Sequence, residues 1–96
     1  MRTRYLVTYD VCDPRRLRRV FKVMKGAGDH LQLSVFRCDL SDRQLEVLKE
    51  KLAREIHAGK DQVLFVEVGP SDGGLAERIW SLGKPYQEAE DGPVIV

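Results

Sequence analysis

The alternation of apolar residues near the N-terminus predicts a β-strand. Residues 2–10 lack Gly and Pro and are rich in β-branched and aromatic types. Tyr5, Val7 and Tyr9 share one face of this strand, and Leu6 lies on the other. Because both faces carry apolar groups, we expect a central strand that is buried on both sides.

Two later segments have the spacing of apolar residues that is typical of amphipathic helices. The first follows Asp13, an N-cap residue, and Pro14 at the first helical position, and it continues to about Lys25. The second begins at a capping box over residues 41–44, and its apolar stripe continues until Gly59. We therefore predict two helices, each with one apolar face.

The remaining segments are extended or ambiguous. Residues 30–40 form either one bent strand or a short hairpin that turns near Ser34, and residues 62–68 are a nearly continuous apolar run that predicts a second central strand. Residues 75–82 fit a short helix or an edge strand. The apolar tip 94–96 has no neighbour in sequence to pair with, so we expect a second subunit to supply the edge, which makes the protein a homodimer.

This order of elements predicts the α+β ferredoxin-like plan βαββαβ, with both helices on one face of an antiparallel sheet. A chain of 96 residues, 43% hydrophobic and 32% charged, suits one domain over residues 1–96. No apolar run approaches the ~20 residues of a membrane helix. No signal-peptide pattern is present, and Cys12 and Cys38 are the only cysteines, so we expect free thiols in a cytoplasmic protein.

Charge is distributed unevenly along the chain. Residues 1–28 contain eight basic and two acidic residues, a net charge of +6, whereas residues 29–96 contain eight basic and thirteen acidic residues, a net charge of −5. No acidic residue lies between Asp13 and Asp29, so the cations of the first helix have no local ion-pair partner. A solvated helix face is the simple interpretation; a phosphate backbone as partner is the alternative. The candidate nucleic-acid-binding residues are Arg15, Arg16, Arg18, Arg19 and Lys22.

Asp10 is the candidate catalytic residue, because it is a carboxylate at the point where an apolar strand leaves the sheet. A solvated turn or a helix cap is the alternative role. The chain has no second carboxylate at metal-binding spacing to Asp10, no serine-histidine-aspartate signature and no glycine-rich phosphate loop. Since Mg²⁺ is commonly held by one or two carboxylates plus water, two Asp10 side chains across a dimer axis would suffice for metal-assisted phosphodiester hydrolysis.

Taken together, these segments resemble the small CRISPR-associated Cas2 family over essentially the whole chain. The likeness is carried by the strand ending Tyr9-Asp10-Val11, the arginine-rich helix after Asp13, Gly28, the segment 32–36, the triplet 83–85 and the terminal 94–96.

The resemblance implies a ferredoxin-like homodimer in which the extension 84–96 crosses to the partner's sheet, and it favours a strand over residues 77–82. It implies a Mg²⁺-dependent endonuclease acting on RNA or DNA in CRISPR antiviral defence and spacer acquisition, with Asp10 as the catalytic and metal-binding residue. Ser34 and Phe36 match family positions near the cleft.

The resemblance also implies an alternative role as a non-catalytic, DNA-binding scaffold dimer that partners the CRISPR integrase subunit. The nuclease depends on Asp10, whereas the scaffold depends on the arginines of the first helix. A ferredoxin-like dimer that binds a small ligand is the third interpretation, and no apolar pocket with convergent polar groups is evident to support it.

Overall fold

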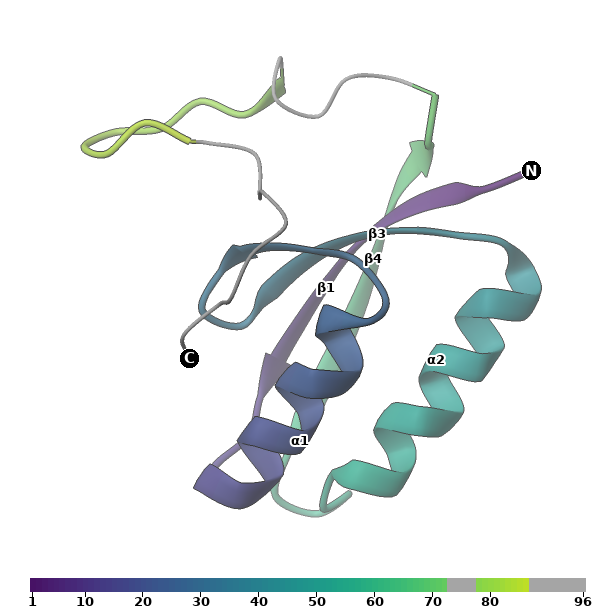
Figure 1. The fold of residues 1–96 in the computed structure, drawn as a ribbon, viewed down its shortest axis with the longest axis vertical. Coiled ribbons are helices and arrows are strands. Elements are labelled where there is room, and N and C mark those ends of the chain that lie inside the picture. The colour runs from purple at the N-terminus through teal and green to yellow at the C-terminus, as the bar shows by residue number, and fades with distance from the viewer. Residues whose placement is uncertain (73–77, 87–96) are drawn as a thin grey trace.

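The computed structural model describes residues 1–72 and 78–86. In this part of the chain two helices pack on one face of a four-stranded antiparallel sheet (Figure 1). The arrangement confirms the α+β ferredoxin-like βαββαβ prediction. The elements in chain order are β1 (Thr3–Asp10), α1 (Pro14–Lys25), β2 (Asp29–Gln32), β3 (Val35–Leu40), α2 (Asp42–Glu55) and β4 (Gln62–Pro70).

The strand order in the sheet is β2-β3-β1-β4, so β1 is central, as predicted. Residues 30–40 form the hairpin rather than one bent strand, with its turn at Leu33 and Ser34. The expectation that residues 62–68 form a central strand is wrong, because β4 is an edge strand that pairs only with β1 among the described residues.

The hydrophobic core lies between the sheet and the two helices. Alternate residues of β1 and β3 point into it, and the buried stripes of α1 and α2 close it from the other side. The side chains that are most completely buried are Phe36, Met24, Leu52, Val7, Val20 and Cys38.

Both helices begin at the caps that the sequence predicts. The Asp13 carboxylate accepts a hydrogen bond of 2.9 Å from the Arg16 amide, and Pro14 occupies the first helical position of α1. Ser41 and Gln44 form the reciprocal capping box of α2. These caps satisfy amides that have no partner within the helix, and they fix where each helix starts.

Gly28 lets the loop after α1 pass close to β3. A Cβ atom there would lie 2.2 Å from the Arg37 carbonyl oxygen and 2.6 Å from Cys38 Sγ, so no larger residue fits without displacing the strand.

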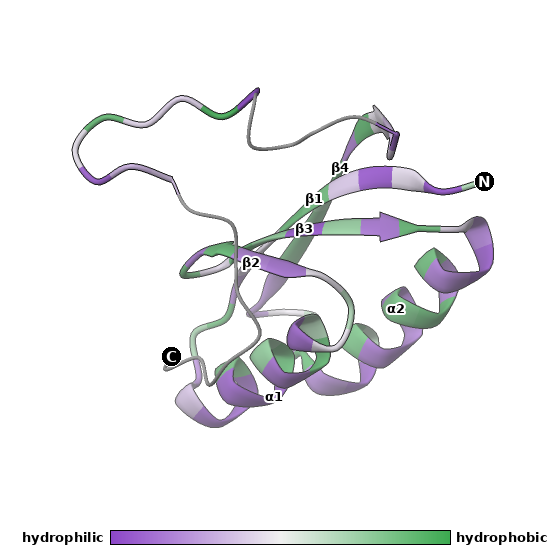
Figure 2. Ribbon diagram, turned by 45° about the horizontal axis from the view of Figure 1, so that its top comes forward, coloured by the Kyte–Doolittle hydropathy of each residue, from purple (hydrophilic) through white to green (hydrophobic). Residues whose placement is uncertain are grey.

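The second face of the sheet is not covered by helices. On β4, every second residue points away from the core and stays about half exposed, at 48% for Leu64 and Val66 and 49% for Val68. β4 and the middle of β1 are hydrophobic along most of their length (Figure 2). β1 is therefore fully buried on one face only, and Leu6 on the helix-free face is partly exposed.

Residues 78–86 form neither an α-helix nor a strand, and they are drawn as the yellow-green segment at the upper left of Figure 1. The ambiguous segment 75–82 and the strand expected over 77–82 begin outside the described residues, and the tip 94–96 lies wholly outside them. No helix in the described residues is long and apolar enough to cross a membrane.

Candidate functional site

Asp10 is the last residue of β1, and its side chain is exposed. The alternation along β1 places it on the helix-free face with Leu6 and Thr8, because Tyr9 points into the core. Among the described residues, the Asp10 carboxylate has no hydrogen-bond or ion-pair partner. Both of its oxygens are therefore available to a ligand.

Ser34 lies beside this strand end. Its backbone carbonyl accepts a hydrogen bond of 3.1 Å from the Tyr9 amide, so the turn of the β2–β3 hairpin is held next to Asp10. The Tyr9 hydroxyl reaches the Leu33 carbonyl of the same turn at 3.4 Å, and burial raises the pKa of Tyr9 to about 12. The fold thus brings Ser34 and Asp10 together.

Phe36 does not share this position. Its side chain is fully buried under α1, with its ring centroid 5.6 Å from that of Phe21 and 6.2 Å from that of Tyr9. The expectation that it lies near a cleft is wrong, because Phe36 occupies an inward position of β3 and its ring is part of the core.

Asp61 is a residue that sequence reasoning missed. Its side chain is completely buried in the turn before β4. The Oδ2 atom accepts hydrogen bonds from Arg16 Nε at 2.7 Å and from the His57 amide at 2.8 Å. The Oδ1 atom accepts from Arg16 Nη2 at 3.2 Å and from the Cys12 amide at 3.3 Å. This carboxylate therefore joins the loop after Asp10, the first turn of α1 and the start of β4.

The pKa of Asp61 is held well below its usual range, first by the Arg16 guanidinium and next by the His57 amide. The bidentate geometry is the stronger form of an arginine–carboxylate pair. The loop that follows Asp10 is therefore held, two positions after Asp10, by a charged carboxylate and not by packing alone.

The same contact separates Arg16 from the other basic residues of α1. The sequence excludes a local ion-pair partner along this helix, and the partner of Arg16 is instead a residue 45 positions away, which the sequence did not reveal. The other four candidates, by contrast, are exposed and have no acidic partner among the described residues. These four residues, the α1 cations, are Arg15, Arg18, Arg19 and Lys22.

Asp10 is the residue of this site that could hold a metal ion. The described residues contain no group of three or more His, Cys, Asp or Glu side chains placed to share an ion. Mg²⁺ keeps several of its waters and is usually held by one or two carboxylates. Within the described residues, each chain therefore offers one carboxylate, that of Asp10, to such an ion.

The cysteines are free thiols, as expected. Cys12 is exposed, whereas Cys38 is fully buried, and burial raises the pKa of Cys38 to about 11. Neither forms part of a metal site within the described residues.

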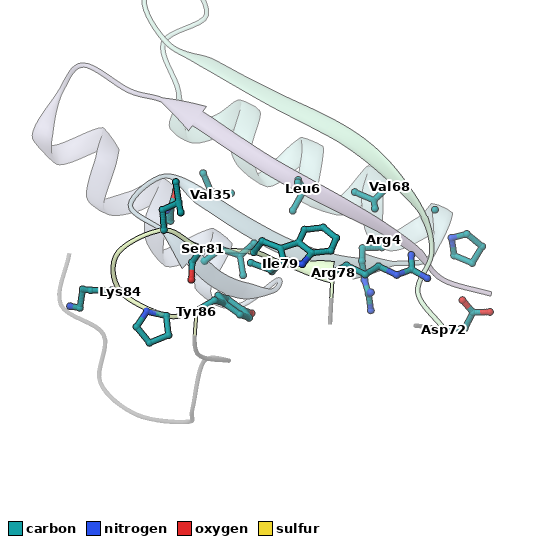
Figure 3. Close-up of a pocket in the computed structure, with 17 residues that line it drawn as sticks. Arg4, Leu6, Val35, Val68, Asp72, Arg78, Ile79, Ser81, Lys84 and Tyr86 are labelled. Atoms are coloured by element: carbon teal, nitrogen blue, oxygen red, sulfur yellow. The ribbon is translucent and has the colours of Figure 1, made fainter. Parts of the chain in front are cut away.

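A cavity of about 1010 Å³ lies between the helix-free face and the segment 78–86. Leu6 and Val68 line it from the sheet, and Ile79 and Tyr86 line it from the segment (Figure 3). Trp80 also lines it and remains 88% exposed. This face is thus both apolar and incompletely covered.

Four charged residues of β1, β2 and β3 form a series of ion pairs, and one of them, Arg4, lines the cavity. Asp39 Oδ1 accepts from Arg4 Nε at 3.0 Å, and its Oδ2 atom lies 3.5 Å from Arg37 Nη1. Arg37 also pairs with Asp29. The charge of Asp39 is therefore shared between two arginines.

These features define a small ferredoxin-like domain with an unpaired carboxylate at the end of β1 and a row of unpaired cations on the next helix. The family model described as "CRISPR associated protein Cas2" matches residues 1–72. The chain belongs to the Cas2 family.

Relatives support this membership over nearly the whole chain. The chain is 41% identical over 93 residues to "CRISPR-associated endoribonuclease Cas2 1" of Rhodospirillum rubrum, covering 96% of this chain and 89% of the relative. It is 35% identical over 92 residues to the protein of Geobacter sulfurreducens called "CRISPR-associated endoribonuclease Cas2", covering 96% of each. The crystal structure of Streptococcus pyogenes Cas2 is similar with a TM-score of 0.72 and 32% identity, covering 83% of this chain and 99% of that one.

Proposed function

We propose that this protein is a Mg²⁺-dependent endonuclease of CRISPR antiviral defence that takes part in spacer acquisition. RNA is the first substrate to test, because the relatives described above are named endoribonucleases. The observation that carries the proposal is Asp10, an exposed carboxylate at a strand end that no described residue pairs with. An unpaired carboxylate in this position is suited to bind a cation.

The proposed active form is a homodimer formed through the helix-free face. An exposed apolar patch bordered by charges is typical of a protein interface, and here Leu64 and Val66 on β4 are half exposed, while Trp80 and Leu82, which line the cavity, are largely exposed. In this dimer the extension 84–96 crosses to the partner's sheet. Asp10 is on the same face, so the dimer would bring two copies of Asp10 together.

Asp10 from each subunit would hold one Mg²⁺ ion, which, when bound, polarises a phosphoryl oxygen and lowers the pKa of bound water. The α1 cations bind the backbone phosphates and orient the scissile bond. Asp61 and Arg16 act as positioning residues, since their ion pair holds the loop that follows Asp10. Ser34 borders the site through the hairpin turn.

A second candidate function is a non-catalytic, DNA-binding scaffold dimer that partners the CRISPR integrase subunit. It is favoured by the α1 cations, four exposed residues without an acidic partner in the described part of the chain, whereas the nuclease depends on the one carboxylate of Asp10. In this function Asp10 has little effect, and the α1 cations determine the affinity for duplex DNA.

Cleavage of single-stranded RNA at increasing Mg²⁺ concentration tests the nuclease directly. Asp10→Asn should abolish Mg²⁺-dependent cleavage. Asp13→Asn is the matched control, because it removes the same charge three residues away while asparagine remains a good N-cap. If highly purified Asp10→Asn protein cleaves RNA like the wild type, the nuclease proposal is overturned and the scaffold function is favoured.

A further inference from the structure

A second basic surface lies at the end of the helical layer far from Asp10. The two helices run antiparallel, so the C-terminal end of α1 and the N-terminal end of α2 meet there, whereas Asp10 and the start of α1 lie at the opposite end (Figure 1). A groove of about 650 Å³ opens between the two helix ends. We call it the α1–α2 groove.

The α1–α2 groove is lined by four cations and an aliphatic floor. Lys22 comes from α1, Arg43 and Lys51 from α2, and Arg2 from the chain start before β1. All four are exposed, and none has an acidic partner among the described residues. The floor includes Val47, which is 42% exposed.

One acidic residue, Asp39, also lines the groove. Its carboxylate is already shared by Arg4 and Arg37 on the sheet, so it does not neutralise the cations of the groove. The side chains that line the groove therefore carry more positive than negative charge.

Arg43 occupies a position that is electrostatically unfavourable for α2. It lies in the first turn of α2, where the helix dipole favours anions and disfavours cations. Arg43, Val47 and Lys51 are spaced four residues apart, so they form one edge of α2 that faces the groove. A bound anion would offset the repulsion among these charges and the dipole.

Lys22 belongs both to the α1 cations and to the groove. The helix α1 has 12 residues and a rise of 1.5 Å per residue, so it spans about 18 Å between the Asp10 end and the groove. A flexible single strand can follow a path of that length and then turn into the groove, whereas a duplex bends only at an energetic cost.

We propose that the α1–α2 groove binds backbone phosphates of a single RNA strand, as a continuation of the phosphate-binding surface formed by the α1 cations. This inference rests on the proposed function. The aliphatic floor contacts sugars and bases without reading their sequence, so the groove extends the footprint of the strand rather than selecting a site.

The test is the salt dependence of RNA binding by the full-length protein, measured in EDTA with a single-stranded RNA. Arg43→Ala combined with Lys51→Ala removes two contacts from α2 and leaves α1 intact. At about 0.7 per phosphate contact on a single strand, the slope of log affinity against log salt should fall by about 1.4. Arg54→Ala combined with Lys60→Ala is the matched control, because both residues are exposed cations outside the groove.

Restoring charge with Arg43→Lys and Lys51→Arg should return the slope to that of the wild type. An unchanged slope in the double alanine variant overturns the proposal, as does an equal loss in the control. The proposal is also overturned if the double alanine variant loses affinity only for duplex DNA, or only for a peptide with the acidic sequence of residues 87–96. Because EDTA excludes metal-dependent cleavage, failure of the Asp10 nuclease test leaves this outcome unaffected.

Discussion

The α1 cations offer a quantitative prediction. Arg15, Arg18 and Arg19 are exposed and have no acidic partner among the described residues, so replacing all three with alanine should remove three phosphate contacts without breaking an ion pair. Arg16 is left unchanged because it holds the buried Asp61. Alanine is a better helix former than arginine, so α1 should remain folded.

At about 0.7 per phosphate on a single strand, three lost contacts lower the salt slope by about 2.1. Between about 50 and 200 mM salt, the wild type should therefore lose about 20-fold more affinity than the triple variant. The assay is fluorescence anisotropy with a labelled single-stranded RNA in EDTA, with far-ultraviolet circular dichroism to confirm the fold.

The control for this assay is Arg54→Ala combined with Lys60→Ala, which removes two exposed cations outside α1. A triple variant whose salt slope equals that of the wild type would refute the reasoning. So would a control that loses as much slope per charge as the triple variant, because the loss would then reflect net charge and not a surface.

Three further predictions concern stability and assembly. The ion pair with Arg16 depresses the pKa of Asp61, so the stabilisation is present above the ordinary carboxyl pKa of about 4 and is lost as the pH falls. Urea midpoints should show Asp61→Asn less stable than wild type at pH 7, with the difference shrinking toward pH 2; a constant difference contradicts this. Burial raises the pKa of Cys38 to about 11, so a thiol reagent at pH 8 should modify Cys12 alone in the native chain and both cysteines in denaturant, and fast reaction of both in the native chain would be inconsistent. Val66→Glu places a charge on the proposed dimer face, where Val66 is 48% exposed, and light scattering should shift to the 11.0 kDa monomer; a persisting dimer argues against that interface.

Local signals predicted the helices and the central strand well. Two capping motifs, Asp13 with Pro14 and the capping box at Ser41, depend on residues within one helical turn. They can therefore be recognised in the sequence, and both are present in the structure. The sequence did not distinguish a hairpin from one bent strand over residues 30–40, because the alternation of apolar residues is the same in a bent strand and in two short strands.

The errors have physical causes that lie outside local pattern. The apolar run in β4 suggested burial on both faces, yet one face of β4 is half exposed in a single chain, as expected for a surface that a partner covers. The pair between Arg16 and Asp61 joins residues 45 apart, and the turn before β4 looks like an ordinary polar loop in sequence. Asp10 could be singled out in the sequence because a carboxylate that ends an apolar strand is unusual in itself, and its role as a site residue stays a prediction.

The central claim is that two Asp10 side chains, one from each subunit, form the metal site. Titration of the purified dimer with Mn²⁺ as a spectroscopic substitute for Mg²⁺ tests it most directly. We expect one tightly bound ion per two chains in the wild type and in Asp13→Asn, and none in Asp10→Asn. One ion per chain, or binding that survives Asp10→Asn, would contradict it.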